Sequence, residues 1–140
     1  MATVFVRGRS RQERTPESAW RSVGMRWLRE RFGRYLWEYR TVGGIGQRNG
    51  VPDDLLLIRY RPLGQSEDAS ELTQGMPQGC FVAIEWKKPT YTGGKRATAQ
   101  DAEIEWIIRC GGRAGKVRNM QELEKLVEGI PVVQSSIKYH

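Results

Sequence analysis

Residue types that support several common enzyme chemistries are scarce in this sequence of 140 residues. The one histidine is His140, which argues against a Ser-His-Asp or Cys-His nucleophile system and against a His-rich zinc site. The two cysteines, Cys80 and Cys110, stand alone and form no CxxC pair. They suggest no disulfide framework, and we therefore expect a protein of a reducing cytoplasm.

Long apolar runs are absent as well. No stretch of about 18 apolar residues occurs, so we expect no membrane span. The first residues, MATVFVRGRSRQER, lack the apolar segment of a signal peptide. A hydrophobic content of 39% and a charged content of 28% instead predict a soluble globular chain. We expect a basic leader over residues 1–14 and a single domain over residues 15–140.

Positive charge is present in excess and is unevenly distributed. The net charge is +7, and residues 1–40 supply +6 of it with ten arginines and four glutamates. A basic segment beside a balanced body is a common layout of proteins that bind polyanions such as nucleic acids. The alternative is an arginine-rich helix whose side chains are simply solvated.

A first helix is predicted to begin at Thr15-Pro16, where threonine can cap the helix and proline fits the first helical position. It is expected to end near Phe32-Gly33. Apolar residues at spacings of three and four predict its buried face: Trp20, Val23, Trp27 and Leu28. At this spacing the two tryptophans are interpreted as core residues and not as platforms for stacked bases.

Two antiparallel strands are predicted next, one in PDDLLLIRY (residues 52–60) and one over Cys80–Lys87, joined by a long loop over residues 61–79. The segment Tyr35–Arg40 fits either a strand or a continuation of the first helix. The predicted order is therefore α-β-β-α-β-α, an α/β domain with a mixed sheet flanked by helices.

The last three elements of that order lie in the final third of the chain. A helix over residues 97–110 is predicted to have an inner face made of three isoleucines: Ile104, Ile107 and Ile108. A short strand follows over Ala114–Arg118. A cap formed by Asn119 and Glu122 then opens a helix that runs through Val127, and Gly129 stops it.

The segment FVAIEWKKPTYTGGKRATAQ (residues 81–100) contains the candidate chemistry. Because side chains two residues apart in a strand point the same way, Glu85 and Lys87 share a face. Asp53 and Asp54 begin the preceding strand, so pairing of the two strands can bring a carboxylate to Glu85. A Mg²⁺ or Mn²⁺ ion would relieve the repulsion, and a neighbouring lysine could orient a water for attack on a phosphodiester. The alternative is an exposed Glu85–Lys87 pair with the two aspartates in a turn.

Four segments together resemble the VRR-NUC domain, a family of the PD-(D/E)XK nuclease superfamily: GVPDDLLL (residues 50–57), FVAIEWKK (residues 81–88), ATAQ (residues 97–100) and CGGRAGKV (residues 110–117). The resemblance spans about residues 15–128. It implies a restriction-endonuclease-like core and an endonuclease that depends on Mg²⁺ or Mn²⁺. Two features depart from the family pattern, namely a second acid at Asp54 and the long loop over residues 61–79.

The resemblance also implies roles for individual residues. Asp53 and Glu85 would be metal ligands, with the backbone carbonyl of Trp86 as a further ligand. Lys87 would act on the water, and Gln100 would position the lysine or the phosphate. Since strand alternation lets one aspartate face Glu85, the position after proline selects Asp53. Many members use a glutamate of the first helix, for which Glu17 is the candidate here, in competition with Glu13 and Glu30.

Short members of the family resemble Holliday-junction resolvases of phages and bacteria. We therefore expect a homodimer that cuts branched or duplex DNA in the cytoplasm of a bacterial or phage-infected cell. Basic residues near the site are candidates for holding the DNA backbone: Arg48, Lys88, Lys95 and Arg96. Two alternatives stay open, a nuclease subunit of a larger restriction or DNA-packaging complex and a non-catalytic DNA-binding module on the same fold.

Overall fold

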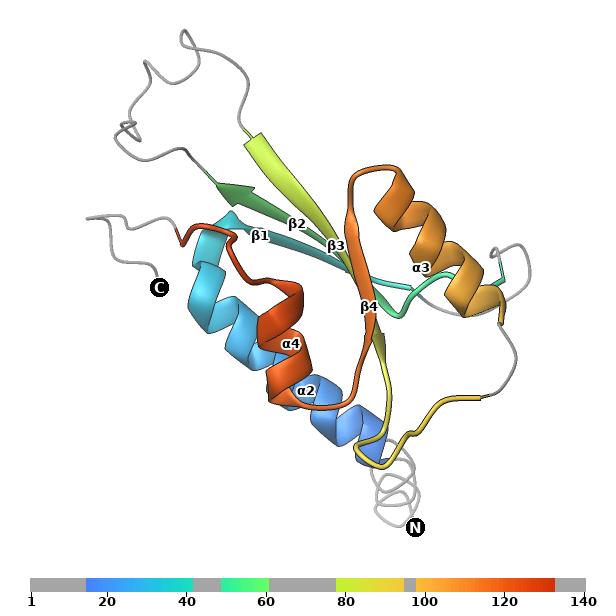
Figure 1. The fold of residues 1–140 in the computed structure, drawn as a ribbon. Helices are drawn as coiled ribbons and strands as arrows, with labels where there is room; N and C mark the ends of the chain where they lie inside the picture. Colours follow the sequence, from blue (N-terminus) through green and yellow to red (C-terminus); the bar gives the residue numbers. More distant parts are fainter. Residues whose placement is uncertain (1–14, 42–48, 61–77, 95–97, 133–140) are drawn as a thin grey trace, which may run out of the picture.

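A computed structural model describes residues 15–41, 49–60, 78–94 and 98–132 of the protein (Figure 1). These residues form one four-stranded mixed sheet with helices on both faces, which confirms the predicted α/β class. The elements in chain order are helix α2 (Pro16–Phe32), the 3-10 turn η1 (Gly33–Tyr35), strands β1 (Leu36–Arg40), β2 (Asp54–Tyr60) and β3 (Gln78–Trp86), helix α3 (Ala99–Arg109), strand β4 (Arg113–Val117) and helix α4 (Met120–Leu126).

The segment that fitted either a strand or a helix is strand β1, so the predicted order α-β-β-α-β-α is wrong by one strand. Gly33, with φ 57°, ends α2 and the 3-10 turn leads into the strand. In β1 the aromatic side chains of Trp37 and Tyr39 are exposed, and Glu38 pairs with Arg29 of α2. Because the polar residue points toward the helix and the aromatics point outward, the usual apolar-in alternation is inverted, and the pattern could not identify the strand.

The strand order in the sheet is β1-β2-β3-β4. The pairs β1–β2 and β2–β3 are antiparallel, and the pair β3–β4 is parallel. The predicted antiparallel pairing of the second and third strands is confirmed. Strand β3 begins at Gln78, so the last two residues of the loop predicted over residues 61–79 belong to the strand. The rest of that loop and the basic leader lie outside the described residues.

Helix α2 has the predicted start and end. The Thr15 hydroxyl accepts a hydrogen bond from the Ser18 N–H at 3.1 Å, and Pro16 occupies the first turn. The buried residues of α2 are Gly24, Met25, Leu28 and Phe32, whereas Val23 of the predicted face is 50% exposed. The two tryptophans of that face are half-buried at its edge. The contact of α2 with the core is centred on Gly24, and a search for recurring apolar side chains does not detect a glycine.

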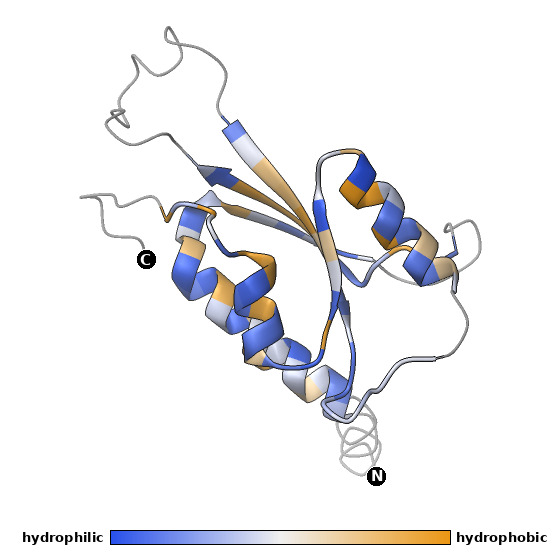
Figure 2. Ribbon diagram, in the orientation of Figure 1, coloured by the Kyte–Doolittle hydropathy of each residue, from blue (hydrophilic) through white to orange (hydrophobic). Residues whose placement is uncertain are grey.

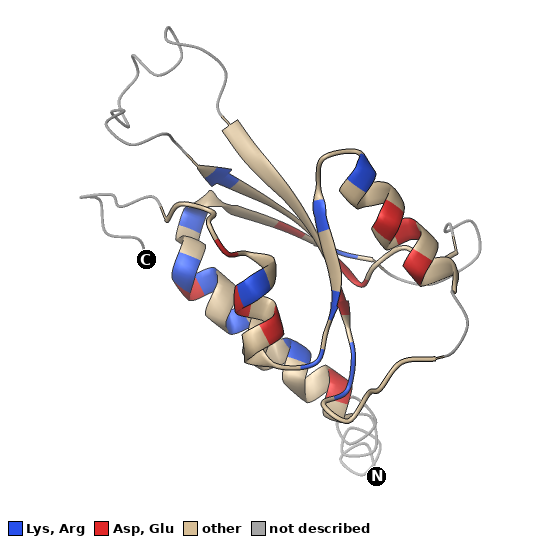
Figure 3. Cartoon of the chain, viewed as in Figure 1, with Lys and Arg blue, Asp and Glu red and all other residues tan. Residues whose placement is uncertain are grey.

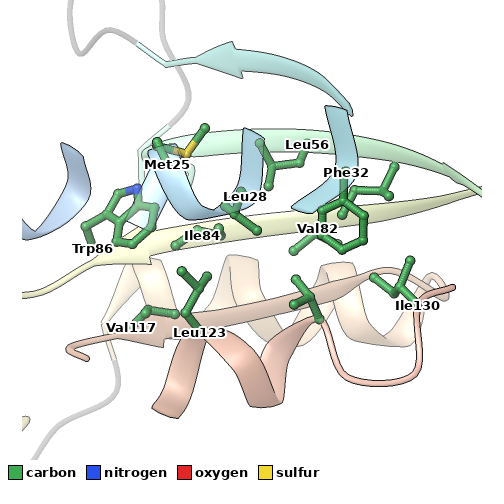
Figure 4. Close-up of a cluster of buried hydrophobic side chains, with 12 residues drawn as sticks. Met25, Leu28, Phe32, Leu56, Val82, Ile84, Trp86, Val117, Leu123 and Ile130 are labelled. Atoms are coloured by element: carbon green, nitrogen blue, oxygen red, sulfur yellow. The ribbon is translucent and has the colours of Figure 1, made fainter. Parts of the chain in front are cut away.

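The main core lies between the sheet and helices α2 and α4 (Figures 1 and 4). The even-numbered residues of β2 and β3 point into it, and Figure 2 shows the apolar colouring along these strands. Side chains from α2, β2, β3, β4 and α4 fill this core: Met25, Leu28, Phe32, Leu56, Ile58, Val82, Ile84, Trp86, Val117, Leu123, Val127 and Ile130.

Helix α3 lies on the other face of the sheet, against β3 and β4 (Figure 1). A capping box holds its first turn, in which the Thr98 hydroxyl accepts from the Asp101 N–H and the Asp101 carboxylate accepts from the Thr98 N–H. No residue of α3 is fully buried, and Ile108 is 53% exposed, so this isoleucine does not belong to an inner face as predicted. Ile104 and Ile107 are half-buried. The helix therefore forms a thin cover over one side of the sheet.

The end of the described chain follows the prediction closely. Strand β4 lies one residue earlier than expected, and α4 begins at the predicted cap, where the Asn119 side chain accepts from the Glu122 N–H at 2.9 Å. Within the described ranges, the helices lack the combination of length and apolar composition that a membrane span requires.

We expect Gly24→Ala to destabilise the protein. A β-carbon at position 24 would lie 2.5 Å from the ring of Trp86, which is itself tied to Asp54 by a hydrogen bond. Overpacking a core costs about 1–3 kcal/mol, whereas alanine gains about 1 kcal/mol over glycine in a helix. Urea unfolding should therefore show a net loss of up to about 2 kcal/mol. Gly115→Ala is the matched control, because its β-carbon would meet Leu126 at an ordinary 3.6 Å. A Gly24→Ala protein more stable than wild type would contradict this packing.

Candidate active site

Four of the predicted site residues converge on the sheet face that α3 covers. Asp53 directly precedes β2, Glu85 lies near the end of β3, and Lys87 follows that strand. Gln100 comes from the first turn of α3. Strand alternation places Glu85 on this face, opposite to the core side chains of Ile84 and Trp86. The site is thus built where an antiparallel strand pair meets the start of a helix.

Gln100 links the carboxylate of Glu85 to the ammonium of Lys87. Its amide nitrogen donates to Glu85 Oε1 at 2.7 Å, and its amide oxygen accepts from Lys87 Nζ at 2.9 Å. The ammonium and Glu85 Oε1 are themselves 3.8 Å apart. Glu85 is 4% exposed, so the alternative of a solvated surface pair is wrong. The bridging amide fixes the lysine beside the carboxylate without a close ion pair between them.

Asp53 and Glu85 are neighbours that repel each other. Burial raises the pKa of Asp53, although the Trp86 N–H, which donates to Asp53 Oδ2 at 2.9 Å, lowers it in part. Burial and then the Asp53 charge raise the pKa of Glu85 from 4.5 to about 7, while Lys87 opposes that shift. Both groups are acceptors when ionised, so they can share a hydrogen bond while one of them is protonated. The pair therefore favours an added proton or cation.

The backbone carbonyl of Trp86 points toward the Asp53 side of the site. The Lys87 N–H donates to the Val117 carbonyl of β4 at 2.9 Å. In a trans peptide the C=O and N–H of one unit point in opposite directions, and none of the described peptide bonds is cis. The Trp86 carbonyl is therefore directed away from β4 and toward β2, the strand that Asp53 precedes.

Asp54 lies on the opposite face, in the core layer. Its two oxygens accept from Arg21 Nε at 2.6 Å and Arg21 Nη2 at 2.8 Å, and Oδ2 also accepts from the Trp86 indole at 2.6 Å. Asp54 is 1% exposed. Of the two adjacent aspartates, Asp53 is the one beside Glu85, as the position after proline indicated. The structural role of Arg21 was not predicted, since an arginine on an amphipathic helix gives no sign of its partner.

Three further residues border the site, and the sequence did not single them out. Lys116 pairs in parallel register with Glu85, so both lie on one face, and its Nζ is 2.8 Å from Asp101 of α3. The ring of Tyr91 lies close to two ammonium groups, with Lys87 Nζ 5.2 Å and Lys116 Nζ 5.6 Å from its centroid. A register for β4 would have pointed to Lys116, but nothing in the chain gives that register in advance.

The remaining predicted site residues are placed less closely. Glu17 is exposed in the first turn of α2, and its charge makes a small contribution to the raised pKa of Glu85. Glu30 lies exposed farther along the same helix, and Lys88 is exposed just after Lys87. The other candidates lie outside the described residues: Glu13, Arg48, Lys95 and Arg96.

Positive charge on α2 does not gather at this site (Figure 3). The helix covers the opposite face of the sheet, and several of its arginines have partners there. Arg21 binds Asp54, Arg29 binds Glu38, and Arg31 lies 5.3 Å from the ring centroid of Trp27. On the face of the site itself, Lys87 Nζ lies 3.8 Å from Glu85 Oε1, and Lys116 is paired in register with Glu85.

The donor set suits a hard divalent cation held by few protein ligands. In the described part of the chain, no three His, Cys, Asp or Glu side chains gather where they could share a metal. Mg²⁺ commonly takes one or two carboxylates and keeps several waters. Asp53 and Glu85 supply two carboxylates, and Glu85 Oε2 is buried with no hydrogen-bond partner among the described residues. An orphaned oxygen beside a second carboxylate fits Mg²⁺ or Mn²⁺ and does not fit a closed zinc site.

Comparison of the chain with protein-family models, with curated proteins and with solved structures finds no match.

We expect the two adjacent aspartates to respond oppositely to substitution. Asp54→Ala leaves Arg21 and the Trp86 indole without their partner, and breaking such a buried pair costs about 3–5 kcal/mol. Asp53→Asn removes a repelling charge and keeps an acceptor for the Trp86 N–H, so its unfolding free energy should equal or exceed that of wild type in metal-free buffer. Urea unfolding of both variants measures this. An Asp54→Ala protein as stable as Asp53→Asn would contradict the arrangement.

The raised pKa of Glu85 predicts a pH dependence of stability. A carboxyl whose pKa is 4.5 when unfolded and about 7 when folded destabilises the folded state progressively as pH rises through that window, and not below it. With chelator present, Glu85→Gln should equal wild type near pH 4.5 and exceed it by about 3 kcal/mol at pH 8. Urea unfolding at both pH values checks this. A constant difference between the two proteins would show that Glu85 does not titrate in this window.

Proposed function

We propose that this protein is a Mg²⁺- or Mn²⁺-dependent DNA endonuclease with the site chemistry of the VRR-NUC domain and the PD-(D/E)XK superfamily. One observation carries the proposal: Gln100 joins the buried Glu85 to Lys87, and Glu85 lies beside the half-buried carboxylate of Asp53. An acid pair that favours a cation, with a fixed lysine beside it, is what hydrolysis of a phosphodiester requires. The free thiols of Cys80 and Cys110 are compatible with a reducing cytoplasm.

Each residue has a distinct part in this mechanism. Asp53, Glu85 and the Trp86 carbonyl would hold the cation, which when bound supplies Lewis-acid polarisation of the phosphate and a lower pKa for water. Lys87 is a compact positive charge that can orient the attacking water and offset negative charge on the phosphate. Gln100 keeps Lys87 in place. Attack of water at phosphorus and departure of the 3′ oxygen leave a 5′-phosphate and a 3′-hydroxyl.

We further propose that the substrate is branched DNA, cut by a homodimer in the manner of a Holliday-junction resolvase. The resemblance of four segments to the VRR-NUC domain supports this proposal, because short members of that family resemble Holliday-junction resolvases, which select branched DNA. Selection by DNA structure therefore suits this chain better than selection by sequence. A nuclease subunit of a larger assembly and a DNA-binding module without catalysis are the other outcomes that the experiments below can reveal.

We expect Glu85→Gln and Lys87→Met to lower cleavage at least about a hundredfold, because loss of a positioned proton-handling or charged group costs this much or more. Labelled four-way junctions, matched duplexes and single strands are incubated with Mg²⁺ or Mn²⁺ and analysed on gels. Glu105→Gln is the control, since Glu105 is 63% exposed on α3 and pairs with Arg109. Normal cutting by Lys87→Met would reject the mechanism, and binding without cutting by wild type would indicate a DNA-binding module.

Cation binding has a readout that does not depend on cleavage. Since the cation would bind the folded site alone, excess Mg²⁺ should raise the wild-type melting temperature, and the rise should disappear in Glu85→Gln. The size of the rise should grow with pH between 5 and 8, because a carboxyl with a pKa of about 7 must lose its proton to bind a cation. Equal shifts in wild type and Glu85→Gln would place the cation elsewhere.

A further inference from the structure

The sheet face that carries the candidate site continues as an apolar surface over β1 and β2. Paired residues of neighbouring antiparallel strands point to the same side and form cross-strand rows. One row consists of Trp37, Leu57 and Phe81. The next row contains Tyr39 and Leu55. Helix α3 packs on this same face against β3 and β4, near the edge of the sheet opposite to the edge strand β1 (Figure 1).

Trp37 and Tyr39 form an aromatic stack that solvent reaches. Their ring planes are 9° apart and their centroids 6.2 Å apart, which is an offset stack. Each residue is 55% exposed. We call this pair the aromatic platform. Two aligned rings with accessible edges and faces offer a third flat ring a place to stack, and every nucleobase has such a face.

The aromatic platform is continuous with the candidate site. The Thr41 N–H donates to the Asp53 carbonyl at 2.8 Å, so the residue two positions after Tyr39 lies beside the acid of the site. Rows two residues apart are separated by about 7 Å along a strand. The Tyr39 row is thus about 7 Å, and the Trp37 row about 14 Å, from the row of Asp53 and Glu85. These spacings match one or two nucleotides of an extended strand whose phosphate lies at the site.

The extent of the exposed surface favours bases over a folded protein partner. A large aromatic side chain can bury about 150–250 Å², so half-exposed side chains leave about 100 Å² each. Trp37 and Tyr39 at 55%, Leu57 at 46% and Phe81 at 36% exposure then offer at most about 400 Å² together. A standard protein interface buries about 800 Å² on each partner. The net charge of +7 and the position of Lys87 on this face further suit a polyanion.

We propose that the aromatic platform binds unpaired DNA bases next to the scissile phosphate, so that the enzyme selects DNA with splayed or single-stranded nucleotides at the cut. This inference rests on the proposed nuclease function, and it adds the site that reads strand separation. A base-paired strand keeps its bases stacked inside the duplex and cannot use the platform. An unpaired nucleotide at a branch or flap can turn its base onto Trp37 or Tyr39.

The test measures binding of a short fluorescein-labelled oligothymidylate by anisotropy, with Ca²⁺ in place of Mg²⁺, and compares it with a blunt duplex. Trp37→Leu keeps an apolar side chain and removes the ring, so single-strand affinity should fall between about fivefold and 150-fold, the range for one stacked base. Trp37→Phe keeps a ring and should retain most of the affinity. Val23→Ala is the control, because Val23 is 50% exposed on α2, which covers the opposite face. Duplex affinity should change less than about twofold in all three variants.

The outcomes separate this inference from the proposed function. Unchanged single-strand affinity in Trp37→Leu overturns the platform, whether or not wild type cuts DNA. A molar mass in light scattering that falls from two copies to one in Trp37→Leu, with unchanged affinity, would show that the face is a dimer contact instead. If single-strand affinity depends on the ring but wild type does not cut DNA with Mg²⁺ or Mn²⁺, the aromatic platform is kept and the nuclease function is rejected. If single-strand affinity depends on the ring, and the preference of cleavage for unpaired substrates is lost in Trp37→Leu, the aromatic platform and the nuclease function are both supported.

Discussion

The ion pair of Asp54 with Arg21 fixes the geometry on which the site depends. Asp54 begins β2, and its carboxylate is held in the core layer by a two-pronged contact from α2 and by the indole of Trp86. Because adjacent side chains of a strand point to opposite faces, this contact obliges Asp53 to point toward α3. The same tryptophan uses its main-chain N–H to bind Asp53. One residue of β3 therefore orients both aspartates, one through its side chain and the other through its backbone.

The arrangement around Glu85 stabilises the folded chain poorly, and this is informative. A buried carboxylate gains most from a close cation and several donors. Glu85 has one amide donor, a lysine 3.8 Å away and a second carboxylate beside it. Burial and like charge then hold its pKa at about 7. Groups whose pKa is shifted in this way by a specific neighbour are concentrated at functional sites. A purely structural role would be filled better by a glutamine or an apolar residue at this position.

The sequence allowed the α/β class, the antiparallel pairing of β2 with β3, and both helix caps at Thr15 and Asn119 to be predicted, because each depends on local chemistry. Strand alternation and pairing also indicated that Glu85, Lys87 and one of the two aspartates would lie together, whereas the choice of Asp53 and the role of Gln100 came from the resemblance to the VRR-NUC domain. The sequence could not identify β1, whose exposed aromatics invert the usual pattern. Nor could it reveal the roles of Lys116 and Arg21. The role of Lys116 depends on the parallel register of β3 and β4, and the role of Arg21 depends on which face of α2 packs on the sheet, a face centred on Gly24.

The two faces of the sheet are packed to different degrees, and this difference suits a substrate as large as a nucleic acid. The face toward α2 and α4 contains the continuous apolar core, so the rigidity of the strands comes from that side. On the other face α3 has no fully buried residue, and its contacts with the sheet include the polar Asp101–Lys116 pair and the Gln100 bridge. A well-packed layer thus fixes the backbone at Asp53 and Glu85. The thin layer above it would leave the side chains of the site and the rings of β1 accessible to the DNA strand that we propose as substrate.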